Sequence, residues 1–424
     1  ALFSGPGRTE IGGNHTDHQH GRVLCGSVDL DVLAAAAPNG KSVIRMIGER
    51  ASARRAQIGA SEVFDFSLGN PSVPCAPEFT RAMIDLYETQ APYALHGYSP
   101  SVGIESVRGA IADSLNRRFG MDYTPAHIFP TAGATAALAH AFRAVAEPGS
   151  EIITFAPYFP EYQPYVAGTG ATLTVVPADT AHFQIDFDAF ERALNPRVAA
   201  VLINTPNNPS GAVYSEQTLR RLAQILEERG REWGHSIFLI SDEPYREIVF
   251  GGAEQPYPAR FYANTLTCYS FSKALSLPGE RIGYVAVNPR AEHAELLVPM
   301  FAQISRTIGH NCPSSSMQLA VARVIDKTSD LGVYERNMEL LYGALVRLGF
   351  TVEKPGGTFY IFPQSPNPDA MEFCEQAMEY DLFMVPSDSF GVPGHLRLSY
   401  CMETDHLERA IERLEQFMRE RYGR

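Results

Sequence analysis

The sequence predicts an α/β fold with a mainly parallel sheet, and three observations support this prediction. From Glu62 onward, short strand-like runs alternate with helical segments, as in strands joined by helical crossovers. The strand-like runs are rich in β-branched residues and are bounded by Gly, Pro and Asn. The chain has 424 residues, of which 45% are hydrophobic, so it is long enough for two domains.

A large domain is predicted over residues 96–311, where each element follows from its local pattern. Apolar residues recur at helical spacing at 104–119, 134–145 and 218–229. Short apolar runs that end at turn-forming residues predict the strands, which lie at 128–130, 151–155, 172–176, 199–204, 237–242 and 265–270.

A smaller α+β domain is predicted from residues 62–95 and 312–424. Its first part holds a strand at 63–68 and a helix at 78–87. Its second part is predicted to consist of a long helix from 313 to about 348, a strand pair at 351–354 and 357–362, a helix at 370–379, a strand at 395–400 and a terminal helix.

The first fifty residues differ in character, because glycine and polar turn-forming residues are dense there. Strand patterns at 22–36 and 41–47 flank the turn Pro38-Asn39-Gly40, so a small β appendage is expected over 1–50. A helical, charge-rich linker is predicted over 51–61, between this appendage and the α/β part.

Composition argues against several function classes. The formal net charge of −13 leaves no basic surplus to neutralise nucleic acid or an acidic membrane. No apolar run is long enough to span a bilayer, and no signal-peptide pattern is seen. The six cysteines are scattered without a Cys-x-x-Cys pair, which is typical of reduced thiols in a cytoplasmic protein and not of a zinc site. We therefore expect a cytoplasmic protein without a metal.

The segment Ser270–Tyr284 contains the strongest chemical signal. It carries Lys273 between small hydroxyl residues and Arg281 shortly after, and its glycines and proline predict a loop. A lysine is a useful covalent catalyst when its amine loses a proton, and an arginine offers donors suited to a phosphate. A lysine for an aldehyde and an arginine for a phosphate together describe a site for pyridoxal phosphate.

Two other predicted strands end in polar side chains. One strand leads into Asn204–Gly211, which contains Asn208, and the next ends at Asp242, with Tyr245 close behind. Asn/Pro/Gly clusters are usually turns, and an acid at a strand end is usually a helix cap. Here, however, three successive strand ends would meet at the edge where open α/β sheets bind ligands.

The ordered set Asn-Asn-Pro-Ser-Gly, Asp-Glu-Pro-Tyr, Ser-x-Ser-Lys and Pro-Gly-Glu-Arg-x-Gly resembles the class I/II aminotransferases. These are enzymes of fold type I that depend on pyridoxal 5'-phosphate, and the resemblance runs from about residue 62 to the end. It implies that Lys273 forms a Schiff base with the cofactor aldehyde and that Asp242 pairs with the pyridinium nitrogen. Tyr245 and Asn208 would hydrogen-bond the phenolic oxygen.

The same resemblance assigns the remaining site residues. The cofactor phosphate would be held by Arg281, Ser270, Ser272 and the backbone of Gly133 and Ala134. Tyr158 would stack on the ring, and Tyr98 would reach the phosphate of a neighbouring subunit, which implies a homodimer. Arg397 would grip the substrate α-carboxylate, with Asn208 and the loop at Gly69 closing on the same group.

The expected function is amino-group transfer between an amino acid and a 2-oxo acid. A carbon–sulfur β-lyase on the same fold is the alternative, because it would use the same cofactor residues. One branch of aspartate aminotransferases reads the distal carboxylate with a lysine where this chain has Thr135. Neutral and aromatic amino acids therefore stay open as substrates.

Residues 1 to about 50 resemble the sugar-binding N-terminal segment of galactokinases, at Pro6-Gly7-Arg8 and His15-Thr16-Asp17. Asn14 stands where many members of that family carry glutamate. The serine-rich ATP loop of the family is not found downstream, and a phosphoryl-transfer enzyme needs such a cradle. A kinase is therefore not expected, whereas a sugar-binding or regulatory role is a third interpretation.

Overall fold

The computed structural model describes residues 2–12, 24–35, 42–252 and 255–424, of which 2–12 and 24–35 are described by their backbone alone. The chain divides into two compact units, Ala1–Met46 and Ile47–Arg424. In the first unit, β1 (Leu2–Gly12) and β2 (Leu24–Ala35) form an antiparallel hairpin.

The helix α1 (Val43–Ile58) replaces two predicted features. The strand predicted at 41–47 is wrong from Val43 onward, and the helix covers most of the predicted linker. Ile47 and Ala51 lie one helical turn apart and are both buried, so a one-sided apolar face favours helix over strand. Arg54 pairs with Asp381, so α1 from Ile47 onward packs within the second unit.

A seven-stranded sheet forms the centre of the second unit, in the order β4-β10-β9-β8-β7-β5-β6. All neighbours pair in parallel except β10, which is antiparallel to both β9 and β4. The mainly parallel sheet is thus confirmed. The strands are β4 (Ile128–Thr131), β5 (Glu151–Phe155), β6 (Thr172–Val176), β7 (Val198–Asn204), β8 (Phe238–Asp242), β9 (Thr265–Ser270) and β10 (Gly283–Val287).

The helices of this part include all those that were predicted and several that were not. In the described part of the chain, no helix is long and apolar enough to cross a membrane. The helices are α2 (Pro77–Thr89), α3 (Pro92–His96), α4 (Glu105–Phe119), α5 (Ala134–Val145), α6 (Tyr162–Ala167), α7 (Phe187–Ala193), α8 (Glu216–Trp233), α9 (Phe271–Ala274), α10 (Ala294–Ile308) and α11 (Ser315–Arg323).

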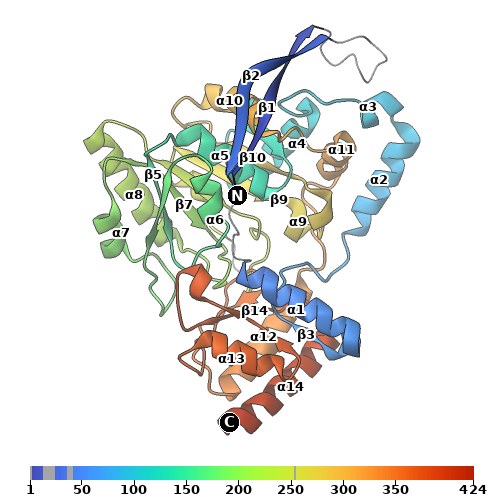
Figure 1. Cartoon of the computed structure of the whole chain (residues 1–424), viewed down its shortest axis with the longest axis vertical. Coiled ribbons are helices and arrows are strands. Elements are labelled where there is room, and N and C mark those ends of the chain that lie inside the picture. Colours follow the sequence, from blue (N-terminus) through green and yellow to red (C-terminus); the bar gives the residue numbers. More distant parts are fainter. Residues whose placement is uncertain (1, 13–23, 36–41, 253–254) are drawn as a thin grey trace. The chain divides into compact units, whose positions relative to one another are not determined.

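A smaller α+β part lies below the sheet in Figure 1, where α1 joins the C-terminal elements. The strand predicted at 63–68 is only two residues long, and no strand forms at 351–354. The long helix predicted from 313 is in fact two helices, α11 and α12, interrupted at 324–331. The elements are β3 (Phe64–Asp65), α12 (Gly332–Arg347), β11 (Tyr360–Ile361), α13 (Ala370–Met378), β12 (Leu382–Phe383), β13 (Val385–Pro386), β14 (Leu396–Ser399) and α14 (Thr404–Tyr422).

The apolar cores depart from the predicted domain boundaries at two places. The core of the smaller part uses Phe64 and Phe66 and then resumes mainly at Tyr334. Helices α2 and α11, both predicted for that part, pack instead with α4 in a core that also contains residues of β9 and β10. The apolar faces of these two helices pack against each other. Both helices therefore belong to the core beside the large sheet, whereas β3, which precedes α2, and α12, which follows α11, belong to the smaller part.

Candidate active site

Three adjacent strand ends build the site, as the sequence predicted. β7, β8 and β9 are neighbours in the sheet, and Asn204 lies opposite Asp242 in the register. The Asn204 amide donates to the Asp242 backbone oxygen (2.8 Å) and accepts from the Asn208 backbone N–H (2.7 Å). The loop that carries Asn208 is therefore tied to the end of β8.

Lys273 lies in the short helix α9 directly after β9, where a loop had been predicted. Ser270 caps this helix by accepting a hydrogen bond from the Ser272 backbone N–H. The Lys273 ammonium donates to the Gly69 carbonyl (2.8 Å). Burial lowers the pKa of Lys273 to about 8, and the nearby Arg281 and Arg397 act in the same direction. A neutral, nucleophilic amine is therefore accessible near neutral pH.

Asp242 is a buried carboxylate with one free oxygen. Its Oδ2 accepts a hydrogen bond from the Tyr162 hydroxyl (2.5 Å), whereas Oδ1 has no partner among the described residues. Burial raises the pKa of Asp242 to about 7, and the Tyr162 hydrogen bond opposes this shift. A cationic nitrogen at Oδ1 would satisfy the free oxygen and favour the ionised form. Tyr162 was not predicted, because no motif marks it.

An anion cradle forms where α5 begins. Gly133 precedes α5 at φ +82°, and a Cβ at this position would lie 2.6 Å from an Arg281 terminal nitrogen. Only glycine lets the arginine approach the helix N-terminus, whose N–H groups from Ala134 onward favour an anion. The Ser270 and Ser272 hydroxyls lie 2.6 Å apart at the end of β9. These donors suit a phosphate.

Arg397 is a buried cation without a carboxylate partner among the described residues. Its terminal nitrogens donate to Asn208 Oδ1 (3.2 Å) and to the Ser67 carbonyl (2.6 Å), while its Nε has no partner there. The guanidinium lies over the Tyr360 ring at 4.7 Å. A buried arginine that contacts only neutral acceptors is suited to a carboxylate ligand.

The loop at Gly69 reaches the same place. Its carbonyl holds Lys273, and a Cβ on Gly69 would lie 1.7 Å from the Tyr360 hydroxyl oxygen, so only glycine fits. The Tyr245 hydroxyl is 3.5 Å from that of Tyr360. Tyr360 was not predicted as a site residue, although it lies within the strand predicted at 357–362.

The two remaining predicted site residues are Tyr158 and Tyr98. Tyr158 is half-buried in the loop after β5, where its ring packs against Gly391. Tyr98 is fully exposed, and the structure does not bring it to the site of its own chain.

Comparison with known proteins decides the family. The profile described as aminotransferase class I and II matches residues 61–414. The chain belongs to this family. Its members use pyridoxal 5'-phosphate, so the chain is a pyridoxal-phosphate-dependent aminotransferase. The free Asp242 oxygen, the buried Lys273 amine and the anion cradle at Gly133 fit that cofactor.

Relatives with curated names and solved structures agree with this membership. An aspartate aminotransferase of Geobacillus stearothermophilus is 31% identical, over 76% of this chain and 84% of that protein. The crystal structure of an amino transferase from Eubacterium rectale is 42% identical with a TM-score of 0.87, covering 90% of this chain and 96% of that one. The aspartate aminotransferase of Thermus thermophilus with maleate is 27% identical with a TM-score of 0.79, covering 89% and 97%.

A second profile, the galactokinase galactose-binding signature, matches residues 1–38. This agrees with the resemblance seen in the sequence. The positions that would hold the sugar by this resemblance, Asn14, His15 and Asp17, lie outside the described residues.

Proposed function

We propose that this aminotransferase moves an amino group between an amino acid and a 2-oxo acid with pyridoxal phosphate held covalently by Lys273. The observation that carries the proposal is that the site contains both a buried amine of lowered pKa, Lys273, and a buried carboxylate, Asp242, that keeps one oxygen free. The two groups follow neighbouring strands, β9 and β8. A lysine for the aldehyde and a carboxylate for the ring nitrogen are the two contacts that this cofactor chemistry requires.

The side chains around these two groups would hold the rest of the cofactor. When bound, pyridoxal phosphate supplies a protonated ring that accepts electron density from the substrate Cα as its proton leaves. Asp242 would keep that ring nitrogen protonated, and Tyr158 would lie against the ring. Asn208 and Tyr245 would contact the phenolic oxygen. The phosphate would be bound by Gly133, Ala134, Ser270, Ser272 and Arg281.

Arg397 would orient the substrate by binding its α-carboxylate as a bidentate pair. Its present contacts, Asn208 Oδ1 and the Ser67 carbonyl, are neutral acceptors, so its charge is left for the substrate carboxylate. Lys273 would then take the proton from Cα, since the lowering of its pKa to about 8 makes the neutral amine accessible near neutral pH. The loop at Gly69 would exclude water from this side of the site.

The amino acid side chain that the enzyme accepts is a separate part of the proposal. The relatives include proteins named aspartate aminotransferase and aspartate/prephenate aminotransferase, and one named aromatic-amino-acid aminotransferase 2. Thr135 follows the first residue of α5 and offers a hydroxyl in place of a cation. We infer that neutral and aromatic amino acids are accepted at least as well as aspartate.

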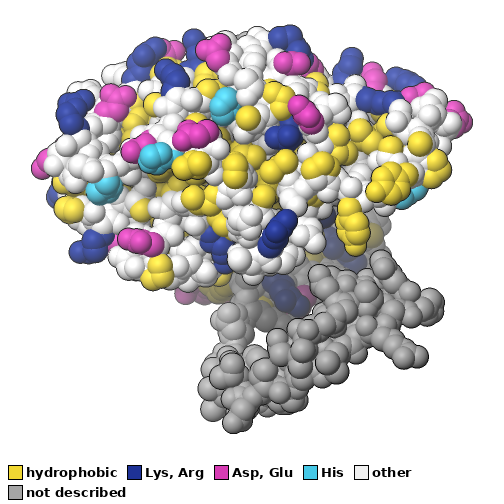
Figure 2. All heavy atoms as spheres, turned by 90° about the horizontal axis from the view of Figure 1, so that it is seen from above, with side chains coloured by type: hydrophobic (Ala, Val, Ile, Leu, Met, Phe, Trp, Pro, Cys, Tyr) yellow, Lys and Arg dark blue, Asp and Glu magenta, His cyan; other side chains and the backbone are white. Residues whose placement is uncertain are grey.

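We also propose that two copies of the chain assemble so that Tyr98 of each reaches the other's phosphate site. Helices α3 and α10 lie at the top of Figure 1, which is the side that Figure 2 shows, and apolar side chains gather across that face. The exposed apolar residues of these two helices and of the loop after α3 include Tyr93, Tyr98, Leu296 and Met300. A cavity of about 490 Å³ adjoins Tyr98 and is lined by Arg306, Asn311 and Ser314. A second copy would cover these side chains.

The deciding experiment incubates the protein and pyridoxal phosphate with a panel of amino acids and 2-oxoglutarate, and measures glutamate. Lys273→Ala is expected to lower the rate by about a thousandfold or more, because both the anchor and the base are lost. Ammonia and pyruvate from a sulfur amino acid, without glutamate, would instead establish the carbon–sulfur lyase.

A second candidate role, sugar binding through residues 1–38, is favoured by the match to the galactose-binding signature. Calorimetry with galactose tests it on the whole chain. Heat of binding that disappears in Asp17→Ala would support the role, and the absence of heat would exclude it.

A further inference from the structure

The turn that carries Asp242 and Tyr245 also carries an ion pair that the proposed chemistry does not use. Glu243 and Arg246 alternate with the two site residues along the chain, and both are almost fully buried. The Arg246 Nε donates to Glu243 Oε2 at 2.7 Å. The turn itself is held by backbone bonds, from Glu243 N–H to the Cys268 carbonyl and from Arg246 N–H to the Glu243 carbonyl.

The two pairs of side chains point to different surroundings. Asp242 contacts Tyr162, and Tyr245 contacts Phe359 and Tyr360. The Arg246 guanidinium instead lies 4.5 Å above the ring of Tyr269, 5.3 Å from Tyr257 and 5.5 Å from Phe119. It also donates to the Tyr284 hydroxyl (3.1 Å). We call Glu243, Arg246 and these four aromatic residues the arginine cage.

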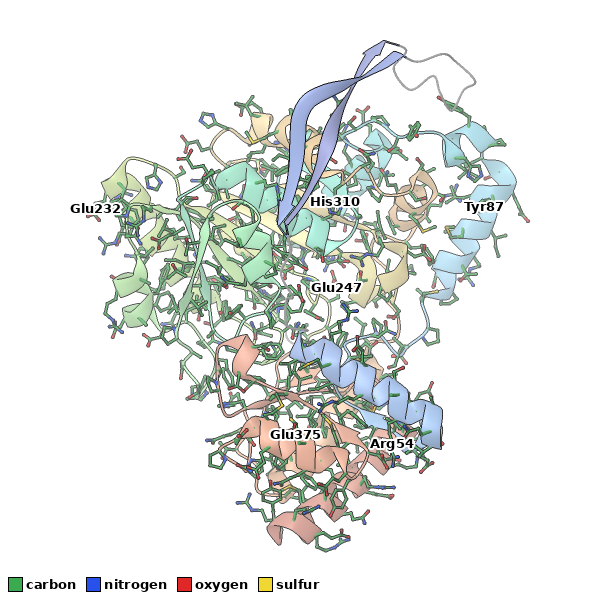
Figure 3. All side chains as sticks on the ribbon, viewed as in Figure 1. Arg54, Tyr87, Glu232, Glu247, His310 and Glu375 are labelled. Atoms are coloured by element: carbon green, nitrogen blue, oxygen red, sulfur yellow. The ribbon has the colours of Figure 1, made fainter. Side chains whose placement is uncertain are left out.

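A second ion pair closes the cage on its outer side. Glu247 accepts hydrogen bonds from Arg118 (2.9 Å) and from the Tyr269 hydroxyl (2.8 Å). Figure 3 shows Glu247 near the middle of the molecule and Glu232 at its outer edge, and their side chains are 10% and 56% exposed. Two glutamates and two arginines therefore balance in charge, of which Glu243 and Arg246 are buried and Arg118 is partly exposed.

A buried ion pair is seldom needed for stability, since well-packed apolar residues often serve as well. Its place beside the site suggests another role. Glu243 is the residue next to Asp242, and its negative charge raises the pKa of the Asp242 carboxyl in addition to burial. Burial raises the pKa of the Glu243 carboxyl and Arg246 opposes this shift, so the arginine both keeps Glu243 ionised and balances its charge next to Asp242.

We propose that Arg246 is a positioning residue of the active site, which neutralises Glu243 so that Asp242 stays ionised and available to the cofactor. The inference rests on the proposed function, because it takes Asp242 as the partner of the ring nitrogen. The aromatic rings of the cage hold the guanidinium by cation–π contact, so the cation cannot turn toward Asp242 itself.

Among the described residues around the turn, the phenols and the Cys268 thiol are not expected to titrate between pH 6 and 9 in a way that would imitate this effect. Burial raises the pKa of the surrounding phenols and of the Cys268 thiol, so they remain neutral in that range. These groups are Tyr162, Tyr165 and Tyr245 around Asp242, and Tyr123, Tyr257, Tyr269 and Tyr284 around Arg246. Lys273 titrates near pH 8, but it does so equally in the wild type and in the variants compared below.

The test measures the dissociation constant of pyridoxal phosphate from the apo protein by absorbance titration at pH 6.5 and pH 8.5. Arg246→Met is expected to weaken binding by about tenfold or more at pH 6.5, and much less at pH 8.5, where Asp242 ionises in spite of Glu243. The double variant Glu243→Gln with Arg246→Met removes both charges and is expected to restore wild-type binding at both pH values.

Arg118→Met is the matched control, because it removes the other arginine of the cluster without unpairing Glu243. It is expected to lower the melting temperature and to leave the ratio of the two dissociation constants as in the wild type. If Arg246→Met does not fold, Arg246→Gln gives the same comparison and keeps a hydrogen-bond donor for Glu243.

The proposal would be overturned if the ratio of the dissociation constants at pH 6.5 and pH 8.5 were the same in Arg246→Met as in the wild type. So would a loss of affinity that Glu243→Gln does not repair. If the wild-type protein itself failed to bind pyridoxal phosphate, the proposed function would fall and this inference with it. Failure of the two proposals is therefore distinguishable.

Discussion

Asp242 and Glu243 are adjacent carboxylates that are both buried, but they differ in whether a cation lies beside them. Glu243 has an arginine at 2.7 Å, whereas Asp242 has only a tyrosine hydroxyl and no cation, and each carboxylate keeps one oxygen without a partner among the described residues. The two buried arginines differ in the same manner. Arg246 is paired with a carboxylate, and Arg397 contacts only neutral acceptors. A buried charge that is paired with an opposite charge within the chain serves the structure, and a buried charge without an opposite partner is one that a ligand can complete.

The largest expected effect that tests this contrast is on the stability of the apo protein. The pKa of Asp242 is raised from 3.8 to about 7, so its native form binds a proton more tightly than the unfolded chain does. Its contribution to stability is complete below about pH 4 and is lost as pH rises through 7. Asp242→Asn is therefore expected to stabilise the apo protein at pH 8 by about 4 kcal/mol, and not at pH 4.

Chemical denaturation of both proteins at the two pH values checks this expectation. Glu243→Gln is the matched control, and its effect at pH 8 should have the opposite sign. It leaves Arg246 buried without a counter-charge, which costs about 3 kcal/mol. If both variants destabilised the protein equally at pH 8, the contrast between the two carboxylates would be lost.

The next effect concerns the two arginines. Arg397→Met is expected to raise the KM for the amino acid by about a hundredfold, since a bidentate charged contact of about 3 kcal/mol is lost. The affinity for pyridoxal phosphate should be nearly unchanged. Steady-state kinetics at saturating cofactor, together with cofactor titration, separate the two quantities.

Arg246→Met provides the comparison for that variant, because it is expected to weaken the cofactor and not the amino acid. The opposite outcome, with Arg397→Met releasing the cofactor and leaving KM unchanged, would contradict the role assigned to Arg397.

The smallest effect concerns Tyr162, whose hydroxyl lowers the pKa of Asp242 against burial. Tyr162→Phe is expected to weaken pyridoxal phosphate binding about tenfold at pH 7, as for the loss of one hydrogen bond to a charged group. The loss should shrink toward pH 9, where the carboxyl ionises without help. Cofactor titration across this range measures it, and a loss independent of pH would point to packing alone.

Local pattern in the sequence was sufficient for much of the fold. Helix α5 and strands β5, β6 and β9 begin and end where they were predicted, because helical periodicity and β-branched runs are set by neighbouring residues. The strand ends that bring Asn208, Asp242 and Lys273 to one edge follow from the parallel order of β7, β8 and β9. What the sequence obscured were short elements, such as α9 within a segment rich in loop-forming residues.

Only the tertiary structure decided how the buried charges are completed. The Tyr162 hydroxyl reaches Asp242 across 80 positions, and Arg397 reaches Asn208 across 189. Neither contact leaves a local signal, and nothing in the string Asp-Glu-Pro-Tyr-Arg tells which carboxylate has an arginine partner. A sequence names the groups that can ionise, but the energy of a buried charge depends on every atom packed around it, and those atoms come from distant parts of the chain.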